Sequence, residues 1–131
     1  MILYTLLTLI SSLLTFNLIK LPSITPTRAS AGVSLVLILS LTLLNNFYSI
    51  NLEALSTVTF GASFVGMCSH KSFSDLHIIV ASIIFICFYK IITPYFIHLG
   101  GALGFSAFLS ICTSYIIFKY SPFTLVKKKL A

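Results

Sequence analysis

Charged side chains are scarce in this sequence. They make up 8% of its 131 residues, and only Glu53 and Asp75 are acidic. Soluble domains carry about 25% charged residues, so this chain has too few charges to cover a water-facing surface. It also has no tryptophan, which leaves tyrosine and phenylalanine to form any aromatic belt at a membrane interface. These absences exclude an ordinary soluble domain and predict that lipid surrounds most of the chain.

Patterns typical of catalysis or metal binding are missing as well. The two acids and three histidines form no paired carboxylates, no metal-ligand spacing and no nucleophile–base arrangement. The cysteines Cys68, Cys87 and Cys112 lie in or beside apolar runs without CxxC spacing, as buried free thiols do. We therefore expect no cofactor and no metal, and interpret the chain as non-catalytic. A membrane-bound enzyme would need His77 or His98 to pair with an acid across the fold, and it ranks third, after the two hypotheses given at the end of this section.

Apolar residues, by contrast, reach 58% and gather in five runs. A spanning helix needs about 20 apolar residues, so the sequence predicts an all-α, polytopic membrane bundle formed by residues 1–131 as a single domain. The expected transmembrane segments are 1–19, 29–48, 54–69, 76–97 and 99–118, followed by a basic tail, 119–131. The first segment lacks a positively charged start, so we interpret it as a retained helix rather than a signal peptide.

The third segment, 54–69, is the shortest. At a rise of about 1.5 Å per residue it reaches roughly 24 Å, less than the ~30 Å hydrocarbon core. Three interpretations of this segment are open. It is a short crossing helix shielded by its neighbours, a re-entrant segment in a four-crossing protein, or a segment that lies in the membrane interface. With five crossings, every lysine and arginine except Lys90 falls on one side, as the positive-inside rule requires. We therefore predict five crossings, with the N-terminus outside and the C-terminus inside, in a bacterial inner membrane or an organelle inner membrane.

Two sets of small residues lie within the apolar segments. They are Gly61, Ser63 and Gly66 in the third segment and Gly100, Gly101 and Gly104 in the fifth. Gly100 and Gly104 form a GxxxG motif, and small residues let two helix backbones approach closely. We predict that the two sets meet by helix packing, within one chain or between copies. The alternative is that they line a permeation path, since glycine-interrupted segments mark binding sites in transporters.

Lys90 is the one ionisable residue well inside an apolar segment, where a charge costs about 2.5–3.5 kcal/mol at the bilayer centre. Three interpretations stay open: the ammonium snorkels to the interface, pairs with an acid of a partner subunit, or serves transport. Pro94 cannot donate a hydrogen bond to the carbonyl of residue 90. Lys90, that carbonyl, Thr93 and the neighbouring tyrosines, Tyr89 and Tyr95, therefore form a candidate polar niche.

The net charge of +6 predicts membrane topology rather than nucleic-acid binding. The tail residues Lys127, Lys128 and Lys129 are expected to hold anionic lipid headgroups, at about 1 kcal/mol per lysine.

The preferred hypothesis is a small non-catalytic integral membrane subunit of a larger complex, structural or contributing to a translocation path. The alternative is a homo-oligomeric transporter or channel, with its glycine-rich segments and Lys90 lining a shared pathway. Expected partners are the bilayer and other membrane subunits or copies of the chain.

Overall fold

The computed structural model describes residues 2–49, 51–69, 71–96 and 101–120. Its helices are α1 (Ile2–Ile19), α2 (Pro26–Asn45), α3 (Leu52–Val65), α4 (Asp75–Ile92) and α5 (Ala102–Tyr120). All but α3 are long and apolar enough to cross a membrane, which fits a multi-pass membrane protein. The all-α prediction is therefore confirmed for the described ranges.

Two helix boundaries differ from the predicted segments because of proline. α2 begins at Pro26 rather than at residue 29, since proline suits the first turn, where its missing N–H would have no partner. α4 ends at Ile92 rather than at residue 97. Pro94 ends it because it has no N–H to donate to the carbonyl of Lys90. The predicted third segment, 54–69, is also shorter as a helix: α3 has 14 residues, or roughly 21 Å.

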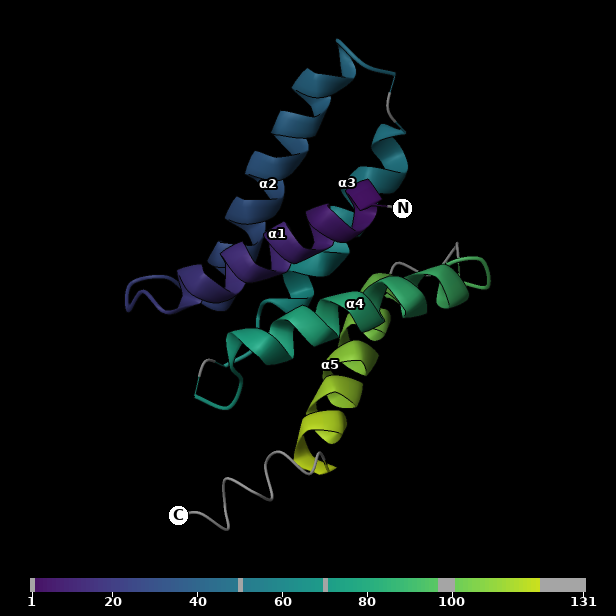
Figure 1. The fold of residues 1–131 in the computed structure, drawn as a ribbon. Helices are drawn as coiled ribbons and strands as arrows, with labels where there is room; N and C mark the ends of the chain where they lie inside the picture. The colour runs from purple at the N-terminus through teal and green to yellow at the C-terminus, as the bar shows by residue number, and fades with distance from the viewer. Residues whose placement is uncertain (1, 50, 70, 97–100, 121–131) are drawn as a thin grey trace.

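α3 lies at the centre of the bundle and contacts all four other helices. Within the described ranges, α2 packs only on α1 and α3, and α5 packs only on α3 and α4. Figure 1 shows α1 and α4 running side by side while α2 and α5 extend away on opposite sides. Half of the 14 residues of α3 are buried, against four of the 19 in α5. The shortest helix is thus the one that its neighbours cover best.

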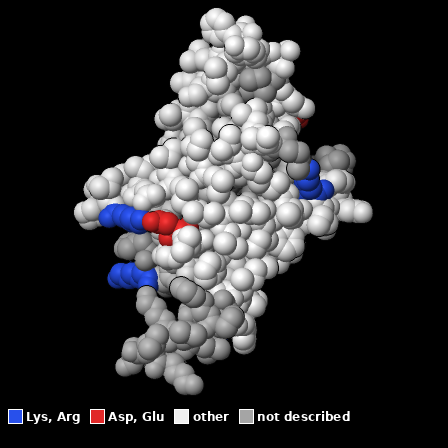
Figure 2. Space-filling model, in the orientation of Figure 1, with Lys and Arg blue, Asp and Glu red and all other residues white. Residues whose placement is uncertain are grey.

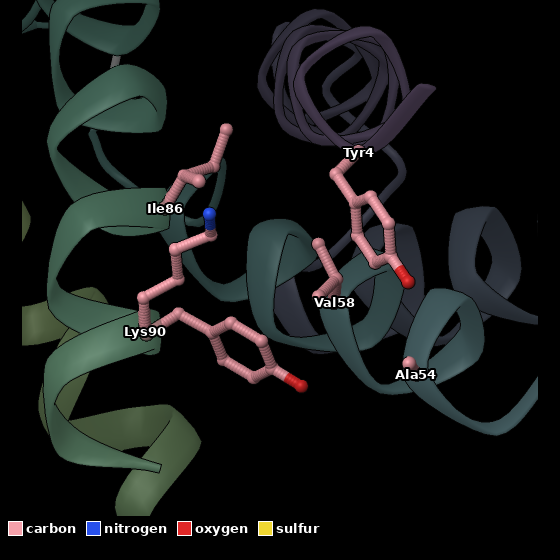
Figure 3. Close-up of a pocket in the computed structure, with 6 residues that line it drawn as sticks. Tyr4, Ala54, Val58, Ile86 and Lys90 are labelled. Atoms are coloured by element: carbon pink, nitrogen blue, oxygen red, sulfur yellow. The ribbon is translucent and has the colours of Figure 1, made fainter. Parts of the chain in front are cut away.

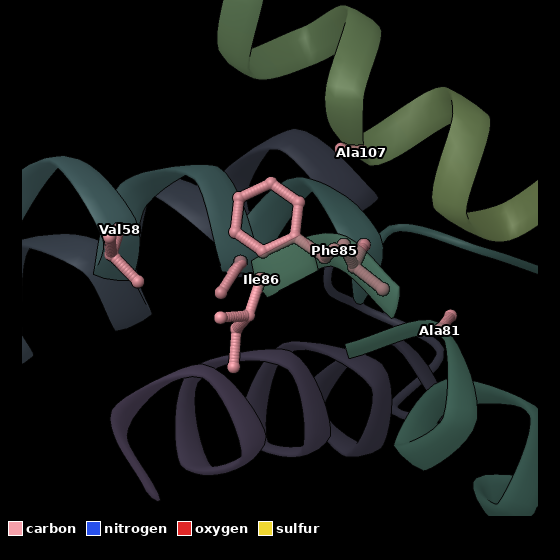
Figure 4. Packing of buried hydrophobic residues seen from close by; sticks show 7 residues of the cluster. Val58, Ala81, Phe85, Ile86 and Ala107 are labelled. Carbon is pink, nitrogen blue, oxygen red and sulfur yellow. The ribbon is translucent and has the colours of Figure 1, made fainter. Parts of the chain in front are cut away.

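Phe85 of α4 fills the main apolar core between α3, α4 and α5, together with smaller side chains (Figure 4). The buried members of this core are Val58, Ala62, Val65, Ala81, Phe85, Ile86 and Ala107. A methyl group on Gly61 would lie 2.6 Å from Cζ of Phe85, so Gly61 provides the space for the ring. Packing of this kind holds helices together where lipid removes the hydrophobic drive for association.

Gly66, directly after α3, packs closely against the backbone of α1. A methyl group there would overlap the carbonyl oxygen of Ser12 and lie 2.7 Å from Cβ of Thr15. Both neighbours belong to the middle of α1, whose backbone cannot move aside as a flexible side chain can. Glycine is therefore required where the end of α3 meets α1.

Candidate functional site

Hydroxyl groups line the interior of the bundle. Every buried polar side chain among the described residues is a serine or a threonine. Most donate to a carbonyl of their own helix, as Ser82 Oγ does to Ile78 O at 2.7 Å. No buried side-chain oxygen or nitrogen in the described ranges lacks a hydrogen-bond partner. The interior polar groups are thus satisfied by the protein itself, as helix contacts in lipid require.

Two serines of α1 connect it to α3 and α4. Ser11 Oγ donates to the carbonyl of Thr59 at 2.8 Å, and the hydroxyls of Ser12 and Ser82 lie 2.6 Å apart. These contacts were not predicted from the sequence. The available signal was the spacing of Thr8, Ser11, Ser12 and Thr15, which places four hydroxyls on one face of the helix. That face is buried in the structure.

Ser63, one of the predicted site residues, joins α3 to α2. Its hydroxyl lies 2.7 Å from that of Ser30 and accepts a hydrogen bond from Ser34 Oγ at 3.0 Å. It also donates to the carbonyl of Phe60 at 2.7 Å. All three serines are buried. Ser63 therefore serves helix packing in this structure, next to Gly61 and Gly66.

The predicted meeting of the two glycine sets within one chain is not supported, and we correct it. Gly101 and Gly104 are exposed, and a methyl group on either would find no atom of the described residues within 4 Å, so both face outward. Gly100 lies outside the described residues. Gly61 packs instead against Phe85 and against Leu103 of α5, whose Cδ2 would lie 3.1 Å from an added methyl group. The spacing of a GxxxG motif defines a helix face, but not the direction in which that face points.

Two adjoining cavities open between the first turns of α1 and α3 and the last turn of α4; we call them together the Tyr89 groove. The first, of about 290 Å³, is lined by Tyr4, Ala54, Val58, Ile86, Tyr89 and Lys90 (Figure 3). The second, of about 370 Å³, is lined by Asn51, Glu53, Ala54, Thr57, Tyr89 and Thr93. They share Ala54 and Tyr89. The groove thus has an apolar and a polar part, a combination typical of ligand sites.

Lys90 lies in the last turn of α4 and is exposed. Its positive charge there complements the negative end of the helix dipole. Helical side chains lean toward the N-terminus of their helix, and Figure 3 shows the ammonium close to Ile86, one turn back along α4. The ammonium therefore lies nearer to the middle of α4 than the backbone of Lys90 does. Of the predicted polar niche, Lys90, Tyr89 and Thr93 line the groove.

Charged residues gather at two opposite ends of the molecule, with an almost uncharged middle on the face that Figure 2 shows. At one end, Lys20 Nζ lies 3.1 Å from Asp75 Oδ1, which joins the end of α1 to the start of α4. Ser114 Oγ of α5 donates to the carbonyl of His77 at 2.9 Å, which brings the end of α5 and Lys119 to the same place. Lys90 lies at the opposite end of α4, in its last turn, and Glu53 lies in the first turn of α3.

The remaining candidate groups are the cysteines and histidines. Cys68, Cys87 and Cys112 are free thiols. His77 accepts a hydrogen bond at Nδ1 from the Ser74 amide at 3.3 Å, so it caps α4. No group of three histidine, cysteine or acidic residues within the described ranges is placed to hold a metal ion. His98 and the tail residues Lys127, Lys128 and Lys129 lie outside these ranges.

Four long apolar helices around a short buried one fit the class of multi-pass helical membrane proteins. No protein-family model matches the chain, and comparisons with curated proteins and with solved structures give no match either.

Proposed function

We propose that the chain is a small non-catalytic integral membrane subunit of a larger membrane protein complex. The observation that carries this proposal is that Gly32, Gly101 and Gly104 face outward, with no atom of the described residues within 4 Å of an added methyl group. Within a helix, where Gly32 and Gly104 lie, glycine costs roughly 0.5–1 kcal/mol of stability relative to alanine and gains nothing from lipid. Against a partner helix, however, it permits close backbone approach. Outward glycines therefore favour contact with another helix.

Each outward glycine region lies in an apolar groove. The first groove, of about 240 Å³ between α1 and α2, is lined by Leu14, Leu18, Gly32, Val33, Val36 and Leu37. The second, of about 260 Å³ between α4 and α5, is lined by Ile92, Phe96, Gly101, Ala102 and Phe105. Because α2 and α5 lie on opposite sides of the bundle (Figure 1), the chain offers two separate faces. Other membrane subunits or further copies of the chain would occupy them.

In this proposal all five helices cross the bilayer, with the N-terminus outside and the C-terminus inside a bacterial or organelle inner membrane. The contact between Lys20 and Asp75 supports five crossings, because this contact places the end of α1 and the start of α4 at the same end of the bundle. α3 then runs from the end that carries Glu53 toward that basic end. The lysines of the tail would reach anionic headgroups on the inner side.

Purification in mild detergent tests the proposal. We expect the wild-type chain to co-purify with a stoichiometric partner, and the Gly104→Leu variant to lose that partner while keeping its helical circular dichroism. Ile116→Ala, on an exposed position of the same helix, is the control and should keep the partner. A wild-type chain that purifies alone as a monomer would contradict the proposal.

The alternative function is a small homo-oligomeric transporter or channel for anions. The Tyr89 groove favours it, because it places the Lys90 ammonium beside a cavity. Gly61 and Gly66 pack against Phe85 and α1, so a shared path would follow the groove and the outward face of Gly101 and Gly104. Anion flux into liposomes that is lost in Lys90→Met would support this function, and the absence of flux with the wild-type oligomer would count against it.

A further inference from the structure

The lining of the Tyr89 groove changes from apolar to polar along one direction. Val58 and Ile86 lie toward the middle of α3 and α4, and the Lys90 ammonium lies beside Ile86 (Figure 3). Asn51, Glu53 and Thr93 lie at the ends of the same two helices. The groove therefore offers a cation beside apolar side chains, and farther out, at the helix ends, a carboxylate with neutral polar groups.

A phospholipid with an amine in its headgroup matches this arrangement, with an anionic group next to its apolar part and a cationic group farther out. Acyl chains lie deepest, the phosphate follows, and a primary ammonium lies nearest to water. We propose that the Tyr89 groove binds an aminophospholipid such as phosphatidylethanolamine. One acyl chain lies along Val58 and Ile86, the phosphate faces the Lys90 ammonium, and the headgroup ammonium faces the Glu53 carboxylate.

Charge complementarity selects this occupant over other lipids. Ionised hydrogen bonds from ammonium to phosphate or carboxylate are stronger than neutral ones, and the groove supplies one partner of each sign. An anionic phospholipid without an amine would satisfy Lys90 but bring negative charge toward Glu53. A quaternary ammonium has no N–H to donate to that carboxylate. The tyrosines Tyr4 and Tyr89 add amphipathic rings, which are enriched at the headgroup level of membranes.

The absence of tryptophan from the chain allows a direct test by fluorescence quenching. Tyr4→Trp introduces a single reporter into the groove, in vesicles of phosphatidylcholine that contain a rising fraction of brominated phosphatidylethanolamine. We expect half-quenching at a mole fraction about five- to tenfold lower than with brominated phosphatidylcholine or phosphatidylglycerol, because the charge-assisted contact of the primary ammonium with Glu53 is absent from both. Phe108→Trp, on the exposed face of α5, is the control reporter, and all three lipids should quench it equally.

Charge variants assign the two headgroup contacts. In the Tyr4→Trp background, Glu53→Gln should remove the preference for phosphatidylethanolamine over both other lipids, because only its primary ammonium donates to that carboxylate. Lys90→Met should raise the mole fraction for half-quenching of all three lipids by about five- to tenfold, because all three carry the phosphate. Lys119→Met, at the opposite end of the bundle, should change neither. Native mass spectrometry of the chain with its own tyrosine, mixed with equal amounts of the three lipids, gives a second measurement: phosphatidylethanolamine should be retained preferentially. Equal retention of all three lipids, or equal effects of Lys90→Met and Lys119→Met, would overturn the proposal. These results do not depend on whether the chain is a subunit of a complex.

Discussion

At the scale of single residues, serine and threonine hydroxyls determine where the helices touch. Ser12 meets Ser82 between α1 and α4, and Ser63 meets Ser30 and Ser34 between α3 and α2. Such contacts between helices in lipid are worth about 0.6 kcal/mol on average and up to about 1.7 kcal/mol. Each is modest, but each links two different helices, so together they favour one arrangement of the bundle over others.

Ser63 provides the clearest test because two hydroxyls of α2 converge on it. We expect Ser63→Ala to lower the free energy of unfolding by about 1–2 kcal/mol, since Ser30 and Ser34 lose a shared buried partner. Ser56→Ala is the matched control: Ser56 Oγ donates to the carbonyl of Glu53 in its own helix, at 3.0 Å. Titration with sodium dodecyl sulfate in mixed micelles, followed by circular dichroism, measures both. Equal losses in the two variants would show that the contacts with α2 contribute nothing.

At the scale of helices, the sequence predicted the elements better than the faces they present to one another. The low charge, the five apolar runs and the prolines were enough to predict an all-helical membrane bundle with a short third helix. The outward direction of Gly104 and the groove beside Lys90 could not be predicted in the same way. In a soluble helix the apolar stripe marks the core face, but in lipid both the core and the surroundings are apolar. The direction of each face then depends on long-range packing, as at Gly66 and Ser12.

The close packing of Gly66 and the outward placement of Gly104 give a paired prediction. Gly66→Ala should destabilise the bundle by about 1–3 kcal/mol, because its methyl group would press on the backbone of α1. Gly104→Ala should leave the stability of the isolated chain unchanged or raise it by up to about 1 kcal/mol, because the site is open and alanine favours the helix. Both are measured by the same detergent titration on the monomer. A loss in Gly104→Ala as large as that in Gly66→Ala would contradict the outward placement of this face.

At the scale of the whole molecule, the arrangement of charge links the fold to the membrane. Lys20, Asp75 and Lys119 lie at one end, where α1 and α5 finish and α4 begins, whereas Glu53 and Lys90 lie at the other end of α3 and α4. Positively charged residues are retained on the inner side of a membrane. The end that carries Lys20 is therefore the inner one in our proposal, and the Tyr89 groove opens toward the outer side.

Labelling of single cysteines tests whether α3 crosses. With Cys68, Cys87 and Cys112 replaced by alanine, we expect Tyr48→Cys and Asn51→Cys to react with a membrane-impermeant maleimide from the outer side of sealed vesicles. Lys71→Cys and the control Lys119→Cys should react only after the vesicles are opened. The reason is that α3, although roughly 21 Å long, is enclosed by four longer helices, and local thinning of the bilayer accommodates a short enclosed helix. If positions 51 and 71 were labelled from the same side, α3 would be re-entrant, and the separation of charge across the membrane would be lost with it.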